Sequence, residues 1–451
     1  MTGNTMPSGG ATVDVWPAAR VGWYATMLLT LAYTFSFVDR QVLNLLVEPI
    51  KQDLSLSDTS ISFLQGLAFV IPYVAMSVPV GRLVDKFNRI AVLVGGVLVW
   101  SVTTFACGMA TSYAQLLVAR MGVGTGEAAV TPAAWSMLAD YFPPDKLARP
   151  VSVFLMGPYL GGGLALIGGA YVLDWAAAVG SVSLPWIGQV ATWQLTFMVV
   201  AMPGIIIVAL LTTLRDPARR QVSDAAVVDP AWRDVFVFLR SEARIYLAVL
   251  VGVPFVIVIL YGLQGWVPTI LVRVYQWELA DAGRIYGTLA LVAGSAGVFC
   301  GPFLGHWLQR RGYEDYPLRV GVIGAVGIML SIVSLPWQTT GTAALVCIGL
   351  ASFFVTLPLA LMTLVLQIVT PNDMRGVVAG FFVVIANVLG LGLGPTLVAA
   401  TTDYILADPN RVHVSLTAVC MIVAPIALAL MMSGMRAMND WGIKQRAGQG
   451  A

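Results

Sequence analysis

Twelve long runs of apolar residues divide this 451-residue chain, and they constrain its fold more than any other feature. Runs of about 18 or more apolar residues with few charges are candidate membrane spans. Lipid forces backbone polar groups to bond within their own segment, so each run is expected to be a helix. The alternating ten-residue segments of a membrane barrel are absent. The expected spans lie near residues 21–47, 60–80, 90–109, 113–139, 150–173, 192–214, 245–272, 283–308, 318–335, 342–369, 376–402 and 412–434.

Positive charges are distributed unevenly over the connections between these spans. If the N-terminus is cytoplasmic, 19 of the 25 lysines and arginines lie on the cytoplasmic side, 4 lie in outer loops and 2 lie within spans. Because cytoplasmic loops carry the excess of lysine and arginine, we expect both termini to be cytoplasmic. The predicted location is a plasma membrane, and specifically a bacterial inner membrane.

The chain repeats itself at a fixed separation, which predicts two similar halves. Gly81 begins a basic loop after the second span, and Gly305 begins a similar one after the eighth, 224 residues later. Parallel six-helix repeats with binding at their interface are a known transporter plan. The expected organisation is a tail at 1–20, a six-helix bundle at 21–214, a linker at 215–244, a second bundle at 245–434 and a tail at 435–451. The fold class is therefore all-α, with twelve transmembrane helices in two pseudo-symmetric bundles.

Three motifs resemble those of the major facilitator superfamily. They are Gly81-x-x-x-Asp85-Lys86-x-x-Arg89 after the second span, Arg120-x-x-x-Gly124-x-Gly126 in the fourth, and Gly157-Pro158-x-x-Gly161-Gly162 in the fifth. Within that superfamily the chain is most similar to the Spinster family of lipid transporters. That likeness rests on Phe37-Val38-Asp39-Arg40, Gly124-x-Gly126-Glu127-Ala128 and Asp140-Tyr141-Phe142-Pro143-Pro144. An Asp-Arg pair in the first span also occurs in organic-anion symporters of the superfamily.

Four charged residues lie inside expected spans of the first half: Asp39, Arg40, Arg120 and Glu127. Charges at such depth are costly and mark candidate functional sites. Glu127 lies about 21 Å into the fourth span, Asp39 and Arg120 at about half that depth. The sequence leaves open which acid pairs with which arginine, and a purely structural ion-pair network remains the alternative. We predict proton coupling and substrate binding here, with Glu127 as the first candidate for the coupling site and Asp39 as the second.

The loop after the second span predicts a cytoplasmic gate. The superfamily resemblance implies that Asp85 meets the start of the eleventh span, where the positive end of the helix dipole favours an acid. Arg89 could pair with Asp140. The predicted gate residues are Gly81, Asp85, Lys86, Arg89, Asp140 and Arg149. Small residues and prolines allow close packing or bending, and the positions predicted to do so are Gly157, Pro158, Gly161, Gly162, Gly394 and Pro395.

The second half carries no such charge cluster, and its candidate cavity residues are neutral: Gln264, Thr363, Gln367 and Asn387. A cavity with charge on one wall and apolar residues on the other suits an amphipathic substrate. We therefore predict a proton-coupled transporter of an amphipathic, anionic, lipid-like substrate. The alternatives are a symporter of small organic anions such as hexuronates or aromatic acids, a multidrug exporter, a channel, and a membrane-embedded enzyme. Symport, antiport and uniport all remain open.

The sequence contains no motif that indicates a metal site or ATP hydrolysis. His306 and His413 lie far apart and form no metal-ligand pattern. No Walker sequence is present, so we expect no ATP dependence and no cofactor. The expected partners are protons, membrane lipids and an amphipathic substrate, with no nucleic acid. The protein is expected to act as a monomer and not as an enzyme.

Overall fold

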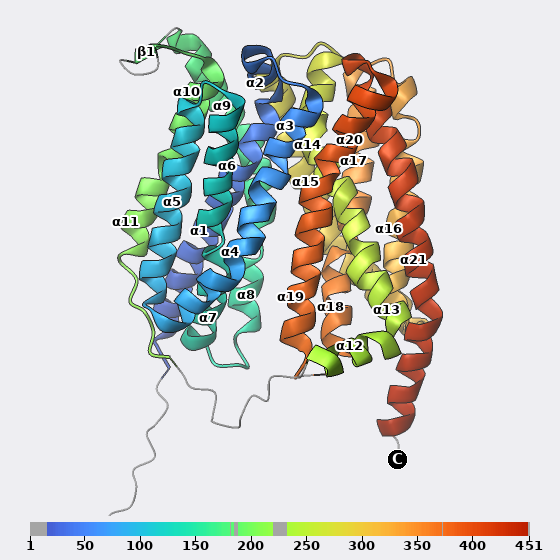
Figure 1. The fold of residues 1–451 in the computed structure, drawn as a ribbon. Coiled ribbons are helices and arrows are strands. Elements are labelled where there is room, and N and C mark those ends of the chain that lie inside the picture. Colours follow the sequence, from blue (N-terminus) through green and yellow to red (C-terminus); the bar gives the residue numbers. More distant parts are fainter. Residues whose placement is uncertain (1–15, 181, 185–187, 220–231, 372, 450–451) are drawn as a thin grey trace, which may run out of the picture.

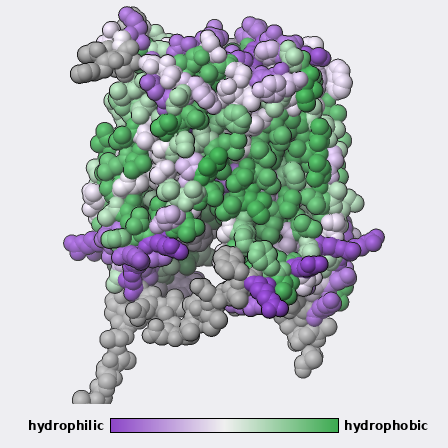
Figure 2. All heavy atoms as spheres, in the orientation of Figure 1, coloured by the Kyte–Doolittle hydropathy of each residue, from purple (hydrophilic) through white to green (hydrophobic). Residues whose placement is uncertain are grey.

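The computed structural model describes residues 16–180, 182–184, 188–219, 232–371 and 373–449. Eleven helical stretches in this part of the chain are long and apolar enough to cross a membrane. The remaining expected span, near 113–139, is present as α6 (Tyr113–Glu127) and α7 (Val130–Tyr141), which are interrupted after Glu127. The predicted twelve-span helical membrane fold is confirmed. Figure 2 shows the corresponding surface, an apolar belt between two hydrophilic ends.

The first half runs from blue to green in Figure 1. Its elements are α1 (Ala19–Leu45), α2 (Val47–Leu54), α3 (Asp58–Gln65), α4 (Leu67–Lys86), α5 (Arg89–Met109), α6, α7, α8 (Ala148–Phe154), α9 (Gly157–Val179), β1 (Val182–Leu184), β2 (Gly188–Val190), α10 (Thr192–Ala201) and α11 (Pro203–Leu211). Strands β1 and β2 pair antiparallel, with Val182 opposite Val190. This small hairpin, which the sequence did not predict, lies in a loop between two spans.

The second half runs from yellow-green to red. Its elements are α12 (Trp232–Ser241), α13 (Ala243–Leu247), η1 (Ala248–Gly252), α14 (Val253–Arg273), α15 (Leu279–Arg310), α16 (Tyr316–Ile332), η2 (Leu335–Trp337), α17 (Gly341–Thr356), α18 (Leu359–Val369), α19 (Arg375–Ile385), η3 (Ala386–Leu393), α20 (Gly394–Ala400), η4 (Thr401–Leu406), η5 (Pro409–Arg411) and α21 (Val412–Gln449). Helix α12 falls within the expected linker at 215–244, of which residues 220–231 lie outside the described part. Helix α21 continues through most of the expected tail at 435–451, and residues 1–15 of the expected N-terminal tail are also undescribed.

Polar side chains in the sequence fix where several helices start. The side chains of Ser57, Asn88, Ser112 and Thr340 each accept a hydrogen bond from a backbone N–H in the first turn that follows. Such caps satisfy backbone donors that a helix start leaves without partners. They place α3 and α5 at the beginning of the second and third spans, and so fix the register of Asp58 and Arg89.

The two halves touch at one end of the molecule and separate at the other. Helix α1 begins and α21 ends at the lower end in Figure 1, called here the arginine-rich end because Arg215, Arg219 and Arg244 lie there. At the opposite end, a Cβ added to Gly66 would collide with the backbone of Leu391 and Gly392, so the second and eleventh spans meet backbone to backbone. Near the arginine-rich end, a Cβ added to Gly81 of α4 or to Gly376 of α19 would meet nothing within 4 Å. The halves are thus closed at the opposite end and open at the arginine-rich end.

Candidate functional site

A buried ion pair connects the first span to the fourth. Arg40 of α1 donates from Nη2 to Oε2 of Glu127 at 2.6 Å, and the two side chains are 5% and 1% exposed. Glu127 is the last residue of α6, directly before the break that separates α6 from α7. This is the pairing in which Arg40 reaches the deeper of the two acids.

The other two charges of the predicted cluster do not form a second ion pair in the described part of the chain. The guanidinium of Arg120 donates to the backbone carbonyls of Leu64, Asp39 and Arg40 at 3.2–3.3 Å. The Asp39 side chain is buried, and its Oδ1 has no hydrogen-bond partner. Arg120 therefore ties α6 to the backbones of α1 and α3, while the Asp39 carboxyl lies nearby without a cation bonded to it.

Aromatic rings surround the guanidinium of Arg40. Its Cζ lies 4.3 Å from the ring centroid of Phe37, 4.1 Å from that of Phe69 and 5.7 Å from that of Tyr73. Cation–π contacts of this kind stabilise a cation most where water is excluded. Arg40 is consequently held by one carboxylate and by ring faces, and its Nε makes no hydrogen bond.

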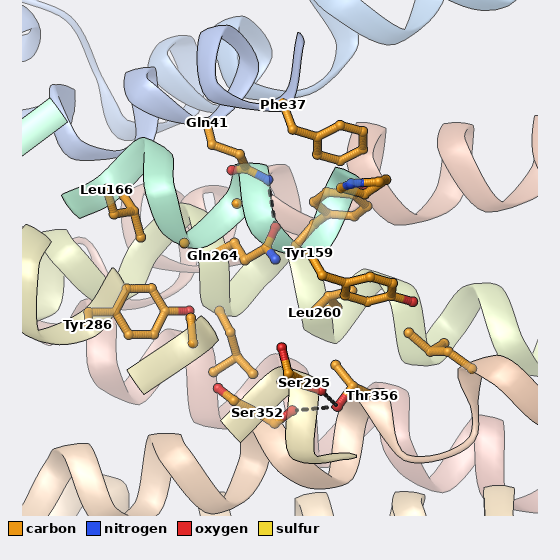
Figure 3. A pocket seen from close by; sticks show the side chains of 18 of the residues that line it. Phe37, Gln41, Tyr159, Leu166, Leu260, Gln264, Tyr286, Ser295, Ser352 and Thr356 are labelled. Atoms are coloured by element: carbon orange, nitrogen blue, oxygen red, sulfur yellow. Dashed lines mark hydrogen bonds between the residues drawn. The ribbon is translucent and has the colours of Figure 1, made fainter. Parts of the chain in front are cut away.

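A cavity with a volume of about 220 Å³ lies between the two halves. Its walls come from α1 and α9 of the first half and from α14, α15, α17 and α18 of the second. Figure 3 shows Gln41 and Gln264 directed toward each other, with Ser295, Ser352 and Thr356 on a different wall. Apolar groups make most of the remaining lining, among them Phe37, Leu166, Ile257 and Leu260. This volume is somewhat below the usual range for small-molecule sites, about 300–1,000 Å³.

The charged cluster borders this cavity without lining it. None of the described residues that line the cavity is charged. Phe37 is the link between the two, because its ring lines the cavity and also contacts the guanidinium of Arg40.

Of the four neutral residues predicted to line the cavity, only Gln264 does so. Thr363 and Asn387 donate to carbonyls of their own helices, and Gln367 is exposed on α18. Gln41 was not predicted, although it follows Asp39 and Arg40 directly in the chain. Tyr159, Tyr261 and Tyr286 also line the cavity, and their scattered positions give no pattern by which the sequence alone would select them.

The predicted gate residues divide into a buried pair and an exposed set. Arg89 is fully buried and forms ion pairs with Asp140 and with Asp216. Asp85, Lys86 and Arg149 are exposed. The expected contact between Asp85 and the start of α19 is not made in this structure, which is open at that end.

The predicted packing residues lie where helices approach closely. A Cβ on Gly161 would collide with the Thr34 carbonyl of α1, and one on Gly394 would lie 2.6 Å from the Val258 carbonyl of α14. The Pro395 carbonyl accepts a hydrogen bond from Trp266 Nε1 at 2.9 Å. Gly157 abuts Tyr33 of α1, while Pro158 and Gly162 line the cavity.

An ion-pair group that the sequence did not indicate joins the halves at the opposite end. Arg273, at the end of α14, donates to Glu48 of α2 at 2.5 Å and to both carboxylate oxygens of Asp58 of α3 at 2.7 Å. Asp403 of η4 accepts hydrogen bonds from both the backbone N–H and the hydroxyl of Thr59 at 2.7 Å. Each of these residues borders a loop in the sequence, so only the tertiary structure shows that they face one another.

Two six-helix halves around a central cavity, closed at one end and open at the other, define a secondary transporter of small molecules. The family model of the Major Facilitator Superfamily matches residues 29–395, and the chain belongs to this family. It is a family of membrane transporters and not of enzymes. The resemblance predicted from the motifs is confirmed.

Several known proteins are similar to this chain. An MFS-type efflux pump of Mycolicibacterium smegmatis is 29% identical over 335 residues, which cover 73% of this chain and 72% of the pump. Protein spinster homolog 1 of Homo sapiens is 24% identical, with 85% of this chain and 74% of that protein covered. A hexuronate transporter of Bacillus subtilis is 23% identical, with 89% and 94% covered.

Solved structures of other membrane transporters have the same fold as this chain. The crystal structure of a bacterial homolog to the human lysosomal transporter Spinster, in an inward-facing and unoccupied conformation, superposes with a TM-score of 0.81 at 23% identity. It covers 94% of this chain and 98% of that one. A D-xylose-proton symporter superposes with a TM-score of 0.69 at 14% identity, with 90% and 97% covered. Spinster proteins are thus among the relatives by sequence and by fold.

Proposed function

We propose that this protein is a proton-coupled secondary transporter that moves an amphipathic, anionic, lipid-like substrate by alternating access. The substrate is of the sphingolipid or lysophospholipid type. The protein works as a monomer in a bacterial inner membrane, with both termini cytoplasmic and without ATP or another cofactor. In that orientation the arginine-rich end faces the cytoplasm, and the structure corresponds to the inward-facing state.

The observation that carries this proposal is the position of the buried Arg40–Glu127 pair beside the central cavity. A carboxylate in a membrane span must be paired or protonated. When Glu127 takes up a proton, its attraction to Arg40 falls, and the guanidinium becomes free to move past Phe37 toward the cavity. A proton shifts a conformational equilibrium only through its different affinity for the two states. The break after Glu127 gives α6 and α7 room to move relative to each other.

The chemistry of the cavity supports a lipid-like substrate over a small organic anion. Its walls are mostly apolar and aromatic, and no charged residue among those described lines it. A hexuronate offers hydroxyls and a carboxylate but no hydrocarbon part, so it would leave the apolar part of these walls without a partner. A substrate with a hydrocarbon part can bury it against Leu166 and Ile257, while an anionic headgroup is attracted to Arg40. A multidrug exporter remains a second candidate, because aromatic and apolar walls also suit drugs and the pump of M. smegmatis is a relative.

Proteoliposomes with an imposed pH gradient test the proposal. Three probes separate the candidates: a fluorescent lysophosphatidylglycerol, glucuronate and ethidium. We expect pH-driven movement of the lysolipid alone. Movement of glucuronate would support the organic-anion reading, and movement of ethidium would support the drug exporter.

The coupling residue is tested with Glu127→Gln, which mimics the protonated acid. This variant should fold and bind the lysolipid but lose its response to the pH gradient. Arg40→Ala should be worse, because it leaves Glu127 unpaired. Glu278→Gln is the matched control, since Glu278 is exposed at the opposite end and outside the cavity. If Glu127→Gln keeps the full response, coupling occurs elsewhere, and Asp39 is the next candidate.

A further inference from the structure

Two glutamines join the two halves across the cavity. Gln41 of α1 donates from Nε2 to Oε1 of Gln264 of α14 at 2.7 Å, and both side chains line the cavity. It is the one direct side-chain hydrogen bond between the halves among the described residues of the cavity wall. Figure 3 shows this bond at the edge of the open space, with the Gln264 amide nitrogen free of the bond. That nitrogen donates to no described residue.

The hydrogen bonds continue from Gln41 away from the cavity. The side-chain Oε1 of Gln41 accepts a hydrogen bond from Asn44 Nδ2. Gln65 Nε2 donates both to Asn44 Oδ1 and to the backbone carbonyl of Gly265, each at 3.1 Å. Gln65 is buried, and its own Oε1 has no partner. The next residue, Gly66, is where the second and eleventh spans meet backbone to backbone. A chain of amides therefore extends from the cavity wall to the seam that closes the opposite end.

These amides define the chemistry that the cavity can recognise. Gln264 offers a free N–H, and the Gln41–Gln264 bond offers one donor and one acceptor to any group that separates them. Carboxylates and phosphates have only acceptors and would leave the Gln264 carbonyl without a donor. An uncharged group that both donates and accepts, such as a hydroxyl, satisfies both amides.

We propose that Gln41 and Gln264 form a subsite for a hydroxyl group of the substrate, which inserts between the two amides and replaces their direct bond. The loss of this cross-half bond loosens the amide chain and favours opening of the opposite end. This inference rests on the proposed transport of an amphipathic substrate, and it specifies that the protein recognises a hydroxyl group of that substrate. A typical neutral hydrogen bond changes such an equilibrium by about fivefold, which is the expected size of each effect below.

The first test uses no substrate and so does not depend on the proposed function. Spin labels at Gln52 and Thr339, which are exposed at the opposite end on different halves, report its opening in a Cys300→Ala background. We expect Gln264→Leu and Gln41→Leu each to raise the ratio of open to closed distances about fivefold. Gln367→Leu is the control, because Gln367 is an exposed glutamine of the same half as Gln264 and does not line the cavity. Distances unchanged from wild type in both cavity variants would overturn the proposal.

The second test addresses the hydroxyl. Lysophosphatidic acid carries one alcohol hydroxyl, on its acyl-bearing glycerol, and its 2-deoxy analogue lacks this hydroxyl but has the same charged phosphate. Wild type should bind the hydroxylated lipid about fivefold more tightly, and Gln264→Leu should not distinguish the two. Equal binding of both lipids by wild type would overturn the subsite. Gln264→Asn, which shortens the side chain by one methylene, provides a milder variant if the leucine substitution prevents folding. A failure of proton coupling alone would leave both results unchanged.

Discussion

Replacing Arg273 by methionine should open the opposite end of the transporter. Arg273 is the only described residue that bonds both Glu48 and Asp58, and these bonds join the two halves. Its Nη1 and Nη2 both donate to the carboxylate of Asp58. Its side chain is 7% exposed and that of Asp58 is fully buried. Methionine keeps an unbranched apolar stem at this position and removes the charged guanidinium.

The magnitude follows from this burial. Removing one partner of a buried ion pair costs about 3–5 kcal/mol, because the other charge is left without compensation. Lys51 remains 2.6 Å from Asp58 and compensates part of this loss. We therefore expect the closed state of the opposite end to lose about 2 kcal/mol relative to the open state. This free energy corresponds to a change of about 30-fold in the population ratio.

The assay is the distance between spin labels at Gln52 and Thr339, with a second pair at Arg82 and Arg310 to follow the arginine-rich end. In Arg273→Met the first distance should lengthen and the second should shorten, because the proposed alternating access couples the two ends. Arg284→Met is the matched control. Arg284 also forms an ion pair across the halves, with Asp174, but the pair is exposed to water and so contributes little. If Arg273→Met gives the same distance distributions as Arg284→Met, the ion-pair group does not hold the opposite end closed.

Three further substitutions test other parts of the argument. Gly66→Ala places a methyl group against the backbone of Leu391 and Gly392. This overpacking costs about 1–3 kcal/mol, so the open population at the opposite end should rise at least about fivefold, measured with the same label pair. Asp85→Asn should weaken the contact with the start of α19 in the state that is closed at the arginine-rich end, and the label pair at that end should report more of the inward-facing state. An unchanged distance would count against the gate. Arg89→Met removes the buried cation that pairs with Asp140 and Asp216. It should lower the free energy of unfolding of the detergent-solubilised protein by about 3–5 kcal/mol in a denaturation assay. The control Arg149→Met, at an exposed position, should change that free energy by no more than about 0.5 kcal/mol.

The local pattern of the sequence was sufficient for the architecture. Length and apolarity decide whether a segment spans a membrane, and both can be read without knowledge of its neighbours. The fourth span was predicted as one segment at 113–139, although Arg120 and Glu127 make it too polar to satisfy a strict measure of apolarity. Its charges also identified the Arg40–Glu127 region, because a charge in lipid needs a partner wherever the fold places it.

The contacts between the two halves depended on the tertiary structure. The sequence left the pairing of the four charges open, and the structure pairs Arg40 with Glu127 while Arg120 bonds to backbone carbonyls, which no pattern of side chains encodes. Gln41 and Gln264 are 223 positions apart and look like ordinary polar residues of two separate spans. Arg273 and Asp58 lie beside different loops, and the bond between them joins two segments that are 215 positions apart in the chain. A sequence determines each helix through its own hydrogen bonds and hydropathy. The contacts between the halves depend on how the finished helices cross, which only the tertiary structure shows.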